Sequence, residues 1–108
     1  MISYGLLGIL QRPERQGQRS FHTASGSGLR IEFMRFSKGD GLGPILYEGQ
    51  VAMTCLEGDF RVGEDGTPAT ALTQVVLDEG DILKIVCMSD EGVVQFIWGP
   101  PFAKSKRL

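Results

Sequence analysis

Histidine and cysteine are scarce in this chain of 108 residues, which holds one histidine and two cysteines. The cysteines, Cys55 and Cys87, lie in separate apolar runs and form no Cys-x-x-Cys pair. A structural zinc site takes four ligands, and His22 cannot complete such a site with these two thiols. The sequence therefore predicts no metal, no cofactor, and two buried free thiols in a reducing, cytoplasmic compartment.

Long apolar runs and an excess of basic charge are also lacking. No run approaches the roughly 20 apolar residues that span a bilayer, and Met1–Leu10 lacks the basic start of a signal peptide. The net charge is −2, and residues 31–100 hold twelve acidic against four basic side chains. An acidic centre argues against a nucleic-acid groove, so we expect neither nucleic acid nor membrane as a partner.

No stretch repeats its apolar residues with the period of an amphipathic helix. Glycine is abundant, at 15 residues, and turn signals such as Asp65-Gly66 recur along the chain. Extended runs are expected at residues 29–33, 45–56, 60–62, 69–77, 82–88 and 93–98. The pattern predicts an all-β fold of seven or eight short strands, an antiparallel sandwich or barrel.

The polar segment before Leu29 is interpreted as a loop or arm, with room for one short strand around Arg19–Thr23. We therefore divide the chain into an N-terminal arm, residues 1–28, and a barrel with a short basic tail, residues 29–108. The apolar run Tyr4–Leu10 could add a strand to a neighbouring sheet, or it could pack on its own barrel.

Turn spacing carries a resemblance to a known family. One stretch runs from Gly39 to a Leu-Glu-Gly turn at Gly58, and a second opens with Gly80-Asp81. Together they resemble the two motifs of the cupin family, whose barrel is a double-stranded β-helix, or jelly roll. The resemblance covers roughly residues 29–99 and implies a cupin-type jelly-roll barrel, which in this family is often a homodimer.

The metal ligands of the first cupin motif are missing from the matching positions. With both motif glycines in register, its two histidines and its glutamate fall on Ile45, Tyr47 and Val51. In the second motif the histidine falls on Glu91. One carboxylate does not hold a transition metal, which takes about three or four N or O ligands. The resemblance thus implies a cupin without the usual metal.

Alternation of side chains along these strands predicts which residues line the barrel. The residues expected to face the lumen and contact a ligand are Ile45, Tyr47, Val51, Met53, Gln95 and Ile97, and Glu91 is expected on the same inward face. A mostly apolar lining with a few polar tips suits a small, largely apolar ligand. The alternative is a lumen filled by its own side chains.

Two polar side chains of that lining are candidates for chemistry. Tyr47 could donate a proton, and Glu91 could act as a general acid or base. The alternatives are a tyrosine bonded to backbone and a glutamate in the surface turn Ser89–Gly92. We therefore expect a metal-independent, small-molecule-binding cupin; a metal-independent isomerase, cyclase or lyase, and a structural or interaction protein with a filled barrel, stay open.

Overall fold

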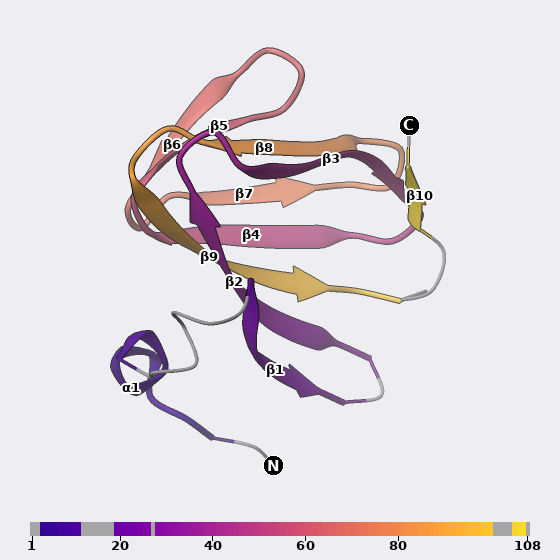
Figure 1. Ribbon diagram of the computed structural model, residues 1–108. Coiled ribbons are helices and arrows are strands. Elements are labelled where there is room, and N and C mark those ends of the chain that lie inside the picture. The colour runs from indigo at the N-terminus through magenta and orange to yellow at the C-terminus, as the bar shows by residue number, and fades with distance from the viewer. Residues whose placement is uncertain (1–2, 12–18, 27, 101–104, 108) are drawn as a thin grey trace.

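The computed structural model describes residues 3–11, 19–26 and 28–100, and the backbone of residues 105–107 (Figure 1). In this part the elements are α1 (Leu6–Leu10), β1 (Ser20–Ser25), β2 (Arg30–Ser37), β3 (Gly41–Tyr47), β4 (Val51–Glu57), β5 (Asp59–Val62), β6 (Thr67–Thr70), β7 (Gln74–Leu77), β8 (Ile82–Cys87), β9 (Glu91–Trp98) and β10 (Ser105–Arg107). The expected all-β fold is confirmed.

The strands form two antiparallel sheets that face each other (Figure 1). Sheet A has the order β1-β2-β9-β4-β7, and sheet B has the order β10-β3-β8-β5-β6. The chain changes sheet at every step from β2 to β5 and again from β6 to β10. This winding of paired strands is the double-stranded β-helix, so the expected jelly-roll barrel is also confirmed.

One cluster of buried side chains occupies the space between the sheets. On β4, Val51, Met53 and Cys55 are buried while the residues between them are only half-buried, which is the alternation of a strand with one face in a core. Phe60 and Leu83 reach the same cluster from sheet B. The described residues include no buried polar or charged residue.

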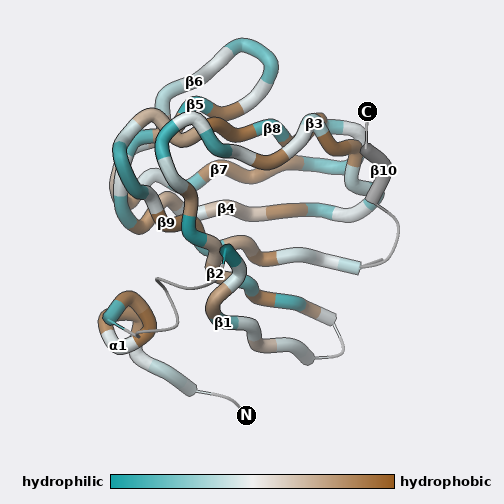
Figure 2. The backbone as a smooth tube through the Cα atoms, viewed as in Figure 1, coloured by the Kyte–Doolittle hydropathy of each residue, from teal (hydrophilic) through white to brown (hydrophobic). Residues whose placement is uncertain are grey.

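The helix α1 packs on the outside of the barrel. Its Ile9 is 1% exposed and lies against Phe21, Phe33 and Val93 on the outer face of sheet A. Figure 2 shows α1 as mainly hydrophobic, in contrast with the hydrophilic loop between β5 and β6. The expectation of no helix is wrong here, because five residues are too few to display a helical period. In the described part of the chain no helix is long and apolar enough to cross a membrane.

Two of the expected extended runs are each divided into two strands. The run 45–56 breaks at Glu48–Gln50, so its first part lies in sheet B and its second part in sheet A. The run 69–77 breaks at the turn around Leu72, which has a positive φ of 69°. The second turn contains the apolar residues Ala71 and Leu72, which favours the prediction of a single strand, whereas Glu48-Gly49-Gln50 is a polar turn signal that the predicted run 45–56 passed over.

Candidate functional site

The residues predicted to line the lumen from β3 and β4 do face the barrel interior. Tyr47, Val51 and Met53 are buried in the central cluster, and Ile45 packs against it. Each is in contact with other core side chains rather than with an open space. Their placement matches the expectation, whereas their role as ligand contacts stays a prediction.

Tyr47 is held by the end of β9. Its hydroxyl donates a hydrogen bond to the backbone oxygen of Gly99, and its ring meets the Trp98 ring edge-on at 5.2 Å between centroids. Burial raises the pKa of Tyr47 above its ordinary value. The hydroxyl thus remains protonated at neutral pH and ties the end of β3 to the end of β9.

The inward placement expected for Gln95 and Ile97 is wrong. In the register of β4 with β9, Met53 lies opposite Phe96, and both belong to the central cluster. Gln95 lies opposite Thr54, so Gln95 and Ile97 are on the outer face of sheet A. The pattern misled because β9 is apolar on both faces, and a shift of one residue exchanges the two faces.

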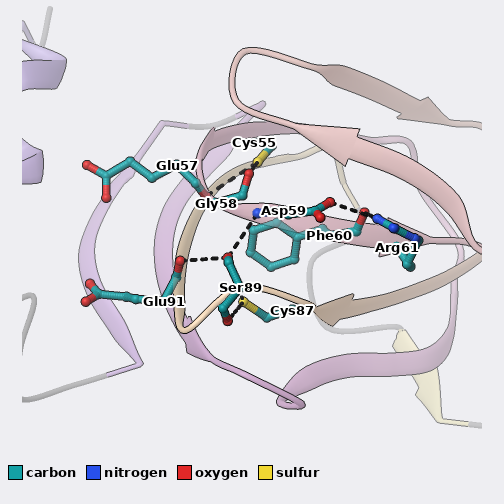
Figure 3. Close-up of polar contacts among 9 residues, drawn as sticks. All are labelled: Cys55, Glu57, Gly58, Asp59, Phe60, Arg61, Cys87, Ser89 and Glu91. Atoms are coloured by element: carbon teal, nitrogen blue, oxygen red, sulfur yellow. Dashed lines mark hydrogen bonds and ion pairs between the residues drawn. The ribbon is translucent and has the colours of Figure 1, made fainter.

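Glu91 also points away from the interior. It is the first residue of β9, and the next residue, Gly92, is the one that faces inward against the Phe60 ring. Figure 3 shows the Glu91 carboxylate directed to the same side as that of Glu57, away from Phe60. The expected inward position of Glu91 is therefore wrong, because the first inward-facing residue of β9 is Gly92, one residue after the position that the motif spacing predicted.

Tyr47 and Glu91 do not share a site. Tyr47 contacts Trp98, the last residue of β9, whereas Glu91 is the first. A strand of this length places its two ends about 23 Å apart, at roughly 3.3 Å per residue. An acid–base pair must reach the same substrate within hydrogen-bond distance, so these two residues cannot act together on a small molecule.

The positions that match the metal ligands of the cupin motifs do not fit a metal here. Ile45 and Val51 carry no donor atom, the Tyr47 hydroxyl is bonded to Gly99, and Glu91 lies on the outside. Among the residues that the structure describes, no three His, Cys, Asp or Glu side chains are grouped so that they could hold a metal ion. We therefore derive no metal-dependent step for this chain.

Both cysteines are free and buried, and their sulfur atoms are engaged at one end of the barrel (Figure 3). Cys87 Sγ lies 3.3 Å from the backbone oxygen of Ser89, and Cys55 Sγ lies 3.5 Å from that of Glu57. The Ser89 hydroxyl accepts a bond from the Asp59 N–H at 3.0 Å and donates to the Glu91 oxygen at 2.9 Å. The two hydrogen bonds of Ser89 join the β4–β5 turn to the β8–β9 turn. The polar contacts at this end of the barrel therefore have a structural role.

The thiol of Cys55 gives the protein a predictable loss of stability in alkali. Burial, with a smaller effect of Asp59, raises the pKa of Cys55 from 9.0 to about 11. Between these values the unfolded chain ionises while the folded chain does not, so the free energy of unfolding should fall by about 2–3 kcal/mol from pH 9 to pH 11. Urea unfolding measures this fall, and in Cys55→Ala the fall should be smaller by this amount, since only the contribution of Tyr47, whose pKa burial also raises, remains. An equal fall in the variant would contradict the assignment.

A polar cluster fixes the first hairpin to the barrel. Glu32 accepts hydrogen bonds from the Ser20 hydroxyl at 2.7 Å and from the Trp98 indole at 3.3 Å. The Arg30 guanidinium lies 4.0 Å from the Glu32 carboxylate and 6.0 Å above the Trp98 ring. Because the polar groups of this cluster bond to one another, the cluster holds β1 and β2 against β9.

A hollow of about 830 Å³ lies on the outside of sheet A, between the N-terminal segment and the β1–β2 hairpin. Its lining residues are Ser3, Tyr4, Ala24, Ser25, Gly26, Gly28, Leu29 and Ile31. A second hollow of about 640 Å³ lies beside the β5–β6 hairpin. Met53 and Tyr47 line neither of them. Sequence reasoning missed the outer hollow because it lies where two segments distant in sequence meet.

Comparisons with known proteins agree with the architecture. No family model and no curated protein matches the chain. An RmlC-like cupin from Desulfovibrio desulfuricans is similar, with 24% identity, a TM-score of 0.70, and coverage of 94% of this chain and 99% of that one. A Klebsiella pneumoniae protein with a double-stranded β-helix domain has 12% identity and a TM-score of 0.79, over 97% of this chain and 89% of that one.

A protein of unknown function with a cupin-like fold, from Ralstonia eutropha, is 25% identical with a TM-score of 0.57, over 67% of this chain. The chain spans about half the length of that protein, 47%. The winding of the strands and these similarities define a double-stranded β-helix protein. By its fold the chain is similar to proteins of the cupin superfamily.

Proposed function

We propose that this cupin is a binding protein for a small, largely apolar molecule, and that it binds outside the barrel. The observation that supports this proposal is the hollow of about 830 Å³ against the outer face of sheet A. Small-molecule sites are typically concave, about 300–1,000 Å³ in volume, and mostly apolar with a few polar groups. The hollow has this size, and Leu29 and Ile31 supply apolar walls.

The hollow is also lined by residues with polar side chains. Ser3 and Tyr4 come from the segment before α1, and Ser25 comes from the end of β1. The Tyr4 ring packs edge-on against the rings of His22, at 5.0 Å, and Phe33, at 6.0 Å. Aromatic packing of this kind holds the N-terminal wall against the sheet, and the hydroxyl groups are left to orient a ligand by hydrogen bonds.

The barrel interior supports this choice of site. Phe36, Phe60 and Phe96 are fully buried in the central cluster together with Met53. A ligand in the lumen would have to displace such side chains, and leaving one of them unpacked costs about 3–5 kcal/mol. The enzyme alternative has less support, because the two candidate catalytic residues lie at opposite ends of β9.

The test is a binding titration with the fluorescent dye anilinonaphthalene sulfonate, which has aromatic rings and one anionic sulfonate group. We expect Ala24→Trp to weaken dye binding by at least ~10-fold, about 1.4 kcal/mol, because the indole would fill the hollow. The matched control is Ala52→Trp. Ala52 lies on the same outer face of sheet A as Ala24, but on β4 and outside the hollow. Its substitution should leave the dye affinity within about twofold.

Two results would contradict the proposal. One is unchanged dye binding in Ala24→Trp, and the other is an equal loss in both variants. If neither result is found, native mass spectrometry of the protein purified from cells should identify a natural ligand, and Ala24→Trp should no longer retain it.

A further inference from the structure

The second hollow lies between the edge strands of the two sheets. β7 ends sheet A, and β6 ends sheet B on the same side of the barrel. The hollow of about 640 Å³ is bordered by the β5–β6 hairpin and by three consecutive residues of β7, Val75, Val76 and Leu77. Successive side chains of a strand point to opposite faces, so a hollow that touches three residues in a row runs along the backbone edge of the strand. The edge of β7 therefore borders open space.

The backbone groups of Val76 point into this space. The Cys55 N–H donates to the Thr73 oxygen at 2.8 Å, so these two residues form a hydrogen-bonded pair at the start of the β4–β7 ladder. Such pairs alternate along an antiparallel ladder. Val75 therefore bonds to β4, whereas the N–H and C=O of Val76 are directed away from β4. These are the groups that an added strand uses for its main-chain hydrogen bonds.

Two exposed apolar side chains and three carboxylates lie along the same edge. Val76 is 67% exposed, and Leu72, in the turn before β7, is 81% exposed. Glu64, Asp65 and Asp81 line the hollow, and none of its described lining residues is basic. Exposed apolar groups beside polar ones are typical of an interaction surface, and the carboxylates favour a partner of the opposite charge.

We propose that β7 pairs with an extended, basic peptide segment of another protein, which adds a strand to sheet A. Side chains of the added strand alternate between the two faces. The residue opposite Val76 contacts that side chain on the outer face, so it is apolar. The residues on either side of it face the hollow and the carboxylates of Glu64 and Asp65, so they are basic. The partner is thus a segment in which basic and apolar residues alternate.

This inference does not rest on the proposed function, because the two hollows share no lining residue. Ala24→Trp, which fills the outer hollow, should leave the affinity for a basic peptide within about twofold. Failure of either proposal is therefore detected separately.

The probe is the fluorescein-labelled peptide Lys-Val-Lys-Val-Lys, and fluorescence anisotropy measures its dissociation constant. One control peptide carries glutamate in place of each lysine. A second control carries an N-methyl group on each valine, which removes the main-chain donors that face Val76 and keeps the charge. Each control should bind at least ~10-fold more weakly than the probe.

Variants of the protein test the same contacts from the other side. Glu64→Lys should weaken binding of the probe at least ~10-fold, whereas Asp90→Lys should change it by no more than about threefold. Asp90→Lys makes the same change of charge, at an exposed position between β8 and β9 that lies outside the hollow.

Val76→Pro should also weaken binding at least ~10-fold, because proline removes an outward N–H and leaves the ladder with β4 intact. Val76→Ile keeps the N–H and the apolar side chain, so it should bind as the wild type does. Circular dichroism confirms that each variant is folded. The proposal would be overturned by any of three results: no saturable binding of the probe to the wild type, equal binding of the N-methylated peptide, or equal losses in Glu64→Lys and Asp90→Lys.

Discussion

Phe96→Ala is expected to lower the free energy of unfolding by about 3–5 kcal/mol. Phe96 is 0% exposed, lies opposite Met53 across sheet A, and stacks on the Trp98 ring at 5.1 Å between centroids. Its removal leaves a cavity in the middle of the barrel, lined by side chains that the surrounding strands hold in place. Urea unfolding followed by circular dichroism measures the change.

The neighbouring residue provides the control. Gln95 lies on the outer face of sheet A, so Gln95→Ala should change the free energy of unfolding by no more than about 0.5 kcal/mol. The motif spacing had placed Gln95 inside the lumen, which would put Phe96 outside. A small effect for Phe96→Ala together with a large effect for Gln95→Ala would show that the register of β9 is wrong.

Gly58→Ala is expected to destabilise the protein by about 2–4 kcal/mol, from a left-handed backbone and overpacking together. Gly58 has a φ of +93°, which side chains of L residues rarely adopt. A Cβ atom there would lie 2.7 Å from the Ser89 hydroxyl and 2.8 Å from both the Glu91 oxygen and the Gly92 Cα. Since two of these three atoms are backbone, the β4–β5 and β8–β9 turns would have to separate.

Gly80→Ala distinguishes the two contributions. Gly80 has nearly the same φ, +94°, but nothing lies within 4 Å of an added Cβ atom. Only the conformational cost remains, about 1–2 kcal/mol. Thermal or urea unfolding of both variants should therefore rank Gly58→Ala as the more harmful. Equal losses would mean that close packing between the two turns does not stabilise the barrel.

The fold was predictable because turns and strands leave local signals. Asp65-Gly66 marks the hairpin between β5 and β6, and both residues lie in that turn. The glycines that carry the family resemblance, Gly39, Gly58 and Gly80, all have positive φ values. The residue type at such a position is dictated by the backbone, so the spacing of these glycines reports the architecture even where no ligand residue remains.

The site was less predictable because it depends on contacts between distant segments. Apolar residues on both sides of β9 serve two clusters, the barrel interior for Phe96 and the packing under α1 for Val93. Alternation alone cannot tell which face is which. The outer hollow likewise joins Tyr4 to Ile31, and no local pattern announces such a meeting.

Binding outside a packed barrel is tested most directly by methyl NMR of the protein titrated with anilinonaphthalene sulfonate. Saturable shifts are expected for the methyl groups of Ala24, Leu29 and Ile31, which line the outer hollow. The methyl groups of Val51 and Met53, in the barrel interior, should not move. Saturable shifts at Val51 and Met53 with none at Ala24 would place the ligand in the lumen and contradict the proposed site.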